Sequence, residues 1–212
     1  MRPINTPPLY YAVKHCHYEA TRLLIEHGAN VNVLIKDIEC PSNGFAYVSN
    51  CGYYHDVCLL HIAVSYNDID MVRLLLDSDT KMPYICPNGS LVSIAICNHN
   101  HNMVDLLYER GIDDGAGFDM RLEKEDYYGE WHNYDEVWCE LEQVLDIGDI
   151  DMIEVVAKHS DQYDKDIMLA TAYDMQVDVS IIKRILQSGA DSSKIIEKAT
   201  YHKSVYDVLT NN

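Results

Sequence analysis

Basic residues are scarce in this sequence of 212 residues. It contains 16 Lys and Arg against 34 Asp and Glu, which gives a formal net charge of −18. Nucleic-acid binding requires clustered Lys and Arg that neutralise phosphates, so this charge excludes nucleic acid as a partner. Anionic membrane surfaces also attract basic segments, so we expect no membrane docking. The charge of the whole chain instead favours a partner protein with a basic patch.

Long apolar runs and paired cysteines are absent as well. No stretch approaches the ~20 apolar residues of a membrane span, and the first eight residues lack the apolar part of a secretory signal. Seven cysteines are scattered along the chain, and no two stand at C-x-x-C spacing. We therefore expect reduced thiols and a cytoplasmic location. Because 48 % of the residues are apolar, the chain should fold despite its charge.

Catalytic signatures are missing too. There is no P-loop, no G-x-G-x-x-G, no H-E-x-x-H and no G-x-S-x-G in the sequence. We expect a non-enzymatic protein with no catalytic residues, no metal and no cofactor. The alternative is a metal-stapled or thiol enzyme built on Cys40, Cys51, His55 and Cys58, whose thiolates and imidazole are zinc-ligand types. Their spacing matches no familiar zinc pattern.

The sequence does contain an internal repeat. Three segments, which begin at Leu9, Leu60 and Val92, superimpose without gaps. Each has a small alanine, Ala12, Ala63 or Ala95, sixteen residues before its closing position. The closing positions are Gly28, Asp79 and Gly111. Self-similarity of this kind is typical of stacked repeat proteins, in which one unit cannot bury its apolar face alone.

The pattern within each segment predicts two short helices. Leu9, Ala12 and Val13 share one face of a first helix that begins near Pro7 and Pro8, since proline is tolerated in a first turn. Polar pairs then predict tight turns, at Cys16–His17 and Asn67–Asp68. Second helices should bury the stripes Ala20, Leu23, Leu24 and Val72, Leu75, Leu76. Gly28 suits a left-handed helix end, whereas Asp79 should loosen the matching end.

These residues resemble the ankyrin repeat family. Pro7-Pro8-Leu9-Tyr10-x-Ala12 and Leu60-His61-x-Ala63 match the motif T-P-L-H-x-A, and Leu60 and Val92 lie 32 residues apart. The resemblance implies an all-α solenoid, a single domain over residues 1–212, with about five repeats and a C-terminal half-repeat cap. The predicted repeats are 5–33, 57–87, 88–114, 137–163 and 164–194, with the cap at 195–212. In the fifth repeat the turn between helices should hold one extra residue.

Two insertions, at 34–56 and 115–136, interrupt the repeat. They fall between repeats, where array proteins place loops on one face, often the binding face. The first contains the hairpin-turn signal Ser42-Asn43-Gly44-Phe45. The second is acidic and rich in Tyr and Trp, the residue types that anchor interfaces. These rings either contact a partner or fold back over the repeats.

The ankyrin resemblance implies protein–protein recognition through first-helix positions and insertion tips. The predicted partner-binding residues are Tyr11, Lys14, His15, Tyr47, Tyr53, Tyr54, Tyr66, Asn98, Phe118, Tyr127, Tyr128, Trp131 and Tyr134. By register, Ile62, Ser65, Ile94 and Cys97 belong to the same face. The resemblance also implies a structural role for His61, and it makes Asn32 either a loop residue or an asparagine-hydroxylation site. We expect hydrogen bonding, not metal binding, from the turn histidines, His15, His17, His99 and His101.

Irregular insertions and degenerate repeats are similar to those of ankyrin proteins from large DNA viruses, especially poxviruses. This resemblance implies a host-range or immune-evasion factor that captures a host protein in the host cytoplasm, as a monomer. Many members of that family end in an F-box-like segment that recruits a ubiquitin ligase. The chain shows no such segment, so the resemblance does not imply that role here. A cellular or bacterial-effector scaffold with the same surface is the alternative.

Overall fold

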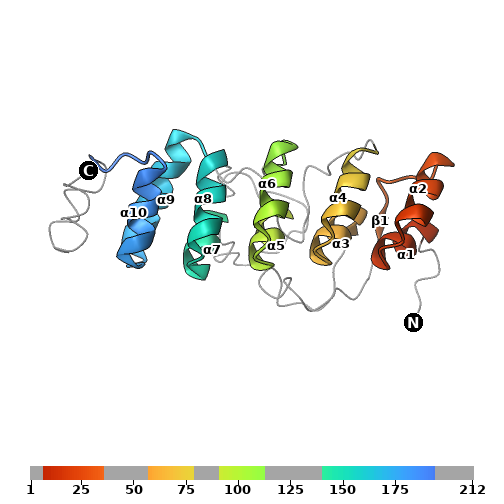
Figure 1. Cartoon of the computed structure of the whole chain (residues 1–212), viewed down its shortest axis with the longest axis horizontal. Coiled ribbons are helices and arrows are strands. Elements are labelled where there is room, and N and C mark those ends of the chain that lie inside the picture. Colours follow the sequence, from red (N-terminus) through yellow and green to blue (C-terminus); the bar gives the residue numbers. More distant parts are fainter. Residues whose placement is uncertain (1–6, 36–56, 79–90, 113–139, 194–212) are drawn as a thin grey trace, which may run out of the picture. The chain divides into compact units, whose positions relative to one another are not determined.

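The structure is a computed structural model that describes residues 7–35, 57–78, 91–112 and 140–193. The cap predicted at 195–212, Asp79, the hairpin signal at 42–45 and the second insertion lie outside these residues. The chain divides into two compact units, Met1–Leu107 and Tyr108–Asn212. Each unit is a stack of helix pairs joined by tight turns (Figure 1).

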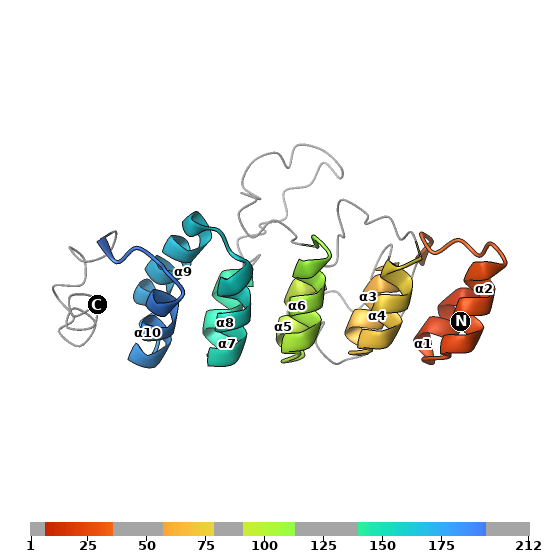
Figure 2. The ribbon, with the colours of Figure 1, turned by 45° about the horizontal axis from the view of Figure 1, so that its top comes forward.

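Unit 1 contains pairs in which a first helix packs against a second helix. In chain order the helices are α1 (Pro8–Lys14), α2 (Tyr18–Glu26), α3 (Leu59–Ser65), α4 (Ile69–Leu76), α5 (Leu91–Cys97) and α6 (His101–Glu109), and the boundary with unit 2, after Leu107, falls within α6. The first helices α1, α3 and α5 pack side by side, and α2 and α4 pack against α1 and α3, respectively (Figure 2). Stacking of this kind buries the apolar stripe that a lone pair would leave in water.

The first helix pair follows the predicted pattern. α1 begins at Pro8, directly after the extended residue Pro7, and Leu9, Ala12 and Val13 are buried. α2 ends before Gly28, whose φ of +86° is the left-handed conformation that glycine adopts without strain. The start and the buried face of α1 and the left-handed end after α2 are therefore confirmed.

The turns between paired helices in unit 1 share one backbone conformation. Cys16, Asn67 and His99 have φ values of +54°, +59° and +52°, and each lies four residues after the small alanine of its repeat. Asp68 then caps α4, because its side chain accepts a hydrogen bond from the amide of Met71. The predicted turns at Cys16–His17 and Asn67–Asp68 are confirmed.

The predicted stripe on α2 is wrong, whereas that on α4 is largely right. Ala20 and Leu23 are exposed, Leu23 by 53 %, and Thr21 is the buried residue of α2. On α4, by contrast, Val72 and Leu75 are fully buried. α4 has repeats on both sides in the chain, but α2 belongs to the first repeat, so one of its flanks has no preceding described repeat to cover it.

Two short strands join the first two repeats. β1 (Leu34–Ile35) pairs antiparallel with β2 (Val57–Cys58), with Leu34 opposite Cys58 and Ile35 opposite Val57. This pairing brings together the two ends of residues 36–56, which form most of the predicted first insertion. The strand pair lies immediately before α3 in the chain.

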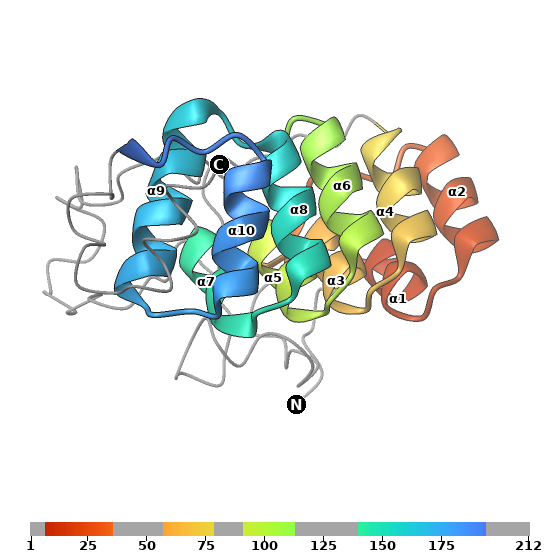
Figure 3. The same cartoon turned by 60° about the vertical axis from the view of Figure 1, so that its left-hand side comes forward.

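Unit 2 repeats the same construction. Its helices are α7 (Glu140–Ile147), α8 (Ile150–His159), α9 (Gln162–Asp174) and α10 (Val179–Gln187). The first helices α7 and α9 pack together, as do the second helices α8 and α10 (Figure 3). Val144, Met152, Val156, Leu169 and Ile185 form part of the buried core between them. No helix within the described residues is long and apolar enough to cross a membrane.

The turn between α9 and α10 holds the predicted extra residue. Gln176, with φ +56°, occupies the position of Cys16 and Asn67, but the cap residue Asp178 follows two positions later instead of one. In the turn between α7 and α8 the same left-handed position is taken by Gly148, with φ +69°, and Asp149 caps α8.

Candidate functional site

Four of the predicted contact residues lie on α1 or directly after α1 and α3. Tyr11 and Tyr66 are exposed by 41 % and 38 %, His15 is exposed and Lys14 is partly buried. The Tyr11 and Tyr66 hydroxyls both act electrostatically on the Lys14 ammonium, so both lie near it. We call Tyr11, Lys14, His15 and Tyr66 the tyrosine–lysine surface.

Lys14 is held in place by aromatic rings. Its Nζ lies 5.6 Å from the centroid of the Tyr10 ring, within the range of a cation–π interaction. Tyr10 in turn meets Tyr11 edge-on, with 5.1 Å between ring centroids. Partial burial acts to lower the pKa of Lys14, but the hydrogen bond with Tyr10 and the nearby Tyr hydroxyls outweigh it and raise that pKa. Lys14 is therefore a firmly charged ammonium.

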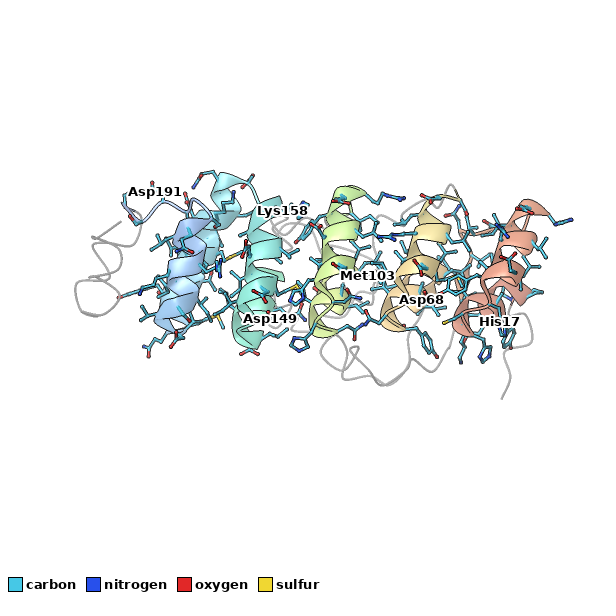
Figure 4. The ribbon with its side chains drawn as sticks, viewed as in Figure 1. His17, Asp68, Met103, Asp149, Lys158 and Asp191 are labelled. Carbon is cyan, nitrogen blue, oxygen red and sulfur yellow. The ribbon has the colours of Figure 1, made fainter. Side chains whose placement is uncertain are left out.

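A second cluster joins the turn of the first repeat to the turn of the second (Figure 4). The Tyr18 hydroxyl donates to Oδ1 of Asp68 at 2.5 Å, and the Cys16 thiol also hydrogen-bonds this carboxylate. Partial burial acts to raise the pKa of Asp68, but these bonds and two backbone amides lower it below the ordinary 3.8. The bond to Asp68, helped by burial, raises the pKa of Cys16 from 9.0 to about 11.

Asparagines connect the second and third repeats. Asn100 Nδ2 donates to Asn67 Oδ1 at 2.6 Å, which links the two turns. Asn98 Nδ2 donates to the carbonyl of Val64 at 3.3 Å, and Asn98 is partly buried. The amide of Asn98 is thus used within the stack, and a partner contact by Asn98 stays a prediction.

The chain resembles a known protein family in sequence and a solved protein in structure. Residues 9–76 match a family model described as ankyrin repeats (many copies). Among solved structures, the ankyrin repeat domain of human ASB11 is similar over 97 % of this chain and 83 % of that domain. The TM-score of that match is 0.54, at 18 % sequence identity. No curated protein matches the chain in sequence.

The fold is an ankyrin-repeat fold. Ankyrin repeats are in general modules for protein–protein interaction, and the fold is typically a non-enzymatic binding scaffold. The tyrosine–lysine surface belongs to the repeats that the family model matches, since all four of its residues lie within 9–76.

The ankyrin register also led to contact residues that the structure rules out. Ile62 and Ser65 of α3 are each only 4 % exposed and Ile94 of α5 is fully buried, so these three side chains are not available to a partner. Their first helices, LLHIAVS and LVSIAIC, are apolar on all sides and are buried accordingly. Cys97 is partly buried, and burial raises the pKa of its thiol.

The remaining predicted contacts lie outside the described residues. They are Tyr47, Tyr53, Tyr54, Phe118, Tyr127, Tyr128, Trp131 and Tyr134. Cys40, Cys51 and His55 of the alternative zinc site lie outside them as well, but Cys58 is described and is buried against His61. Their Sγ and Nδ1 atoms are 2.9 Å apart. Among the described residues no group of three His, Cys, Asp or Glu side chains has the geometry of a metal site.

Three further residues considered in the sequence are the turn histidines His15 and His17 and the loop residue Asn32. The rings of His15 and His17 lie 6.0 Å apart, centroid to centroid, at the turn after α1. The backbone N–H of Asn32 donates a hydrogen bond to Oδ1 of Asn30, as expected for a loop after a helix. Sequence reasoning missed the Asp68 cluster altogether. The polar turn pair Asn67–Asp68 was the one feature of the sequence that pointed to this cluster. The donors to Asp68, Cys16 and Tyr18, belong to a different repeat, so the sequence pattern did not connect them with it.

Proposed function

We propose that this chain is a non-enzymatic protein-binding module and that its tyrosine–lysine surface contacts the partner. The supporting observation is that two exposed rings, Tyr11 and Tyr66, both lie near the Lys14 ammonium. Tyrosine is among the residue types enriched at interface hot spots, because a rigid ring supplies contact area and its hydroxyl supplies a hydrogen bond. Tyr11 stands on α1 and Tyr66 directly follows α3, and both helices are anchored by buried residues, so little conformational freedom is lost when a partner binds.

We further propose that the partner is a host protein, and that the chain acts as a host-range or immune-evasion factor. Support for this step comes from the sequence alone, through the long insertions and irregular repeats that resemble those of viral ankyrin proteins. The insertion aromatics Tyr127, Tyr128 and Trp131 are proposed as additional contacts. Tyr and Trp are residue types that anchor interfaces, which is the reason for including them.

Affinity purification from animal-cell lysate, followed by mass spectrometry, would identify candidate partners, and the purified partner would then be titrated calorimetrically. Tyr11→Ala with Tyr66→Ala should weaken binding at least about 30-fold, because two hot-spot rings are lost. Tyr163→Ala, an exposed ring on α9 of unit 2, is the matched control and should leave affinity unchanged. Equal binding by the double variant and the wild type would refute the proposed surface.

A second variant separates the two proposed contact regions. Replacement of Tyr127, Tyr128 and Trp131 by Ala should abolish capture if the second insertion contributes to the interface. Loss of binding in this variant alone would assign the interface to the insertion and not to α1 and α3. A partner that comes equally from lysates of unrelated organisms would contradict the host-range role but not the binding function.

A further inference from the structure

In the first three helix pairs, the carboxylates that stand on helices all belong to the second helices. The first helices α1, α3 and α5 contain no Asp or Glu, and their only charged residue is Lys14. Asp and Glu on the second helices lie at Glu19, Glu26, Asp70, Asp105 and Glu109. The two rows of helices are separate in the structure (Figure 3). The first helices α1, α3 and α5 themselves therefore carry none of the chain's negative charge.

Lys14 differs from the arginines of the same unit in its partners. Arg22 pairs with Glu19 at 2.5 Å, and Arg73 lies 3.8 Å from Asp70, each within its own helix. Within the described part of the chain no carboxylate pairs with Lys14, whose contacts are the rings and hydroxyls around it. The charge of Lys14 is therefore still available to an anion that approaches from outside.

The closest acid in sequence to Tyr66 is already engaged. Asp68 follows Tyr66 by two residues, but its carboxylate accepts hydrogen bonds from Tyr18, Cys16 and the Met71 amide. A carboxylate satisfied in this way is poorly placed to pair with Lys14. The Lys14 ammonium and the nearby hydroxyls of Tyr11 and Tyr66 are donor groups of the kind that an incoming carboxylate accepts hydrogen bonds from.

We propose that the tyrosine–lysine surface binds an acidic segment of the partner protein, with a partner carboxylate at Lys14 and partner apolar side chains against Tyr11 and Tyr66. This inference rests on the proposed function and names the chemistry of the partner at that surface. It differs from the basic partner that the charge of the whole chain favours. At physiological salt the Debye length is about 8 Å, so charges behind a helix of ~10 Å diameter are largely screened at this surface.

Selection of peptides from a phage-displayed library of random twelve-residue sequences tests the inference with the full chain as bait. The enriched peptides should carry an excess of Asp and Glu beside apolar residues. Lys14→Gln, which removes the charge and keeps most of the side-chain length, should lose this acidic excess. Arg22→Gln removes a cation that is already paired on α2 and should retain it.

The fluorescence anisotropy of one enriched, fluorescein-labelled peptide measures how strongly each variant binds it. Lys14→Gln should weaken binding about tenfold, Lys14→Arg should restore it to within about threefold, and Arg22→Gln should change it less than twofold. Thermal unfolding followed by circular dichroism would confirm that each variant folds.

Three outcomes would overturn the inference, and they differ from a failure of the proposed function. Enrichment of basic or uncharged peptides would show that the surface binds peptides of another chemistry, which leaves the binding function intact. No enrichment at all would show that the surface takes no linear segment, and partner capture by the full chain would then judge the function separately. Tighter binding of single-stranded oligothymidine than of the peptide would assign the surface to a polyanion instead.

Discussion

At the scale of single residues, Asp68 connects the first two repeats through its carboxylate. It caps α4 through the Met71 amide and accepts hydrogen bonds from Tyr18 and Cys16 of the preceding repeat. Its pKa is lowered, so its contribution to stability is present above the unfolded value and is lost as pH falls through the folded one. The pKa of Cys16 is raised, so its contribution is complete below pH 9 and is lost as pH rises toward about 11.

Replacement of Asp68 by Asn should therefore make the Cys16 thiol more reactive. A fall in the pKa of Cys16 from about 11 towards 9.0 raises its thiolate fraction at pH 8 by about 100-fold, but the less basic thiolate is a weaker nucleophile. The net expectation is alkylation by iodoacetamide about tenfold faster. Mass spectrometry of the peptide that contains Cys16 separates this thiol from the other six cysteines.

Asp70→Asn is the matched control for that measurement. It removes the same charge two residues away, on an exposed side chain that lies near Arg73 instead of Cys16. Alkylation of Cys16 in this variant should stay within about twofold of the wild type. If Asp70→Asn accelerates alkylation as much as Asp68→Asn does, then the general negative field controls the thiol, and not the hydrogen bond to Asp68.

At the scale of elements, each turn between paired helices holds one residue in the left-handed backbone conformation. Most of the residues found there have a Cβ atom, so this conformation costs them free energy. The left-handed position is occupied by Cys16, Asn67, His99, Gly148 and Gln176, with φ between +52° and +69°. A residue with a Cβ atom loses about 1–2 kcal/mol in this conformation, although Asn tolerates it better than most. Glycine occupies the position in only one of these five turns.

Gln176→Gly should therefore stabilise unit 2. Relief of the left-handed strain exceeds the extra chain entropy of glycine, and we expect a net gain of about 0.5 kcal/mol in the free energy of unfolding. Met175→Gly in the same turn, where φ is −74°, should instead destabilise, because no strain is relieved there. Urea unfolding followed by circular dichroism measures both.

Gly148→Ala provides the reverse test in the same unit. Its φ is +69°, and an added Cβ would lie 3.9 Å from the Ile181 side chain, which is ordinary contact. The cost, about 1 kcal/mol, should then come from the backbone alone. A Gln176→Gly variant no more stable than the wild type, together with a harmless Gly148→Ala, would contradict the strain account of these turns.

At the scale of the whole molecule, the sequence could predict the features that each repeat encodes locally, such as helix faces and helix ends. Leu9, Val13 and Gly28 were placed correctly because helix periodicity and left-handed ends are short-range properties. Leu23 and Ile62 were misassigned, because exposure depends on which neighbours cover a helix and not on its own pattern. Within the candidate site, register identified Tyr11 and Tyr66.

The contacts that define the site are the part that could not be predicted. Tyr18 and Asp68 are 50 residues apart, and no local pattern relates them. The surroundings of Lys14 likewise depend on α3 stacking beside α1, which brings Tyr66 near the ammonium. A repeat sequence predicts its unit well, whereas interactions between units require the stack itself.

The net charge of −18 also predicts a property of the whole chain, which is stabilisation by salt. Like charges repel in the compact state, and an increase from 10 mM to 500 mM NaCl shortens the Debye length from about 30 Å to about 4 Å. If screening contributes about 1 kcal/mol, a unit of about 100 residues should gain roughly 5 °C in unfolding temperature by scanning calorimetry. The opposite result, a lower unfolding temperature in salt, would mean that ion pairs such as Arg184–Glu154, at 2.9 Å, outweigh the repulsion.

Glu154→Gln distinguishes the two cases, because it removes that pair together with one negative charge. Under repulsion the variant should gain slightly less from salt than the wild type, whereas under ion-pair control the loss in salt should shrink.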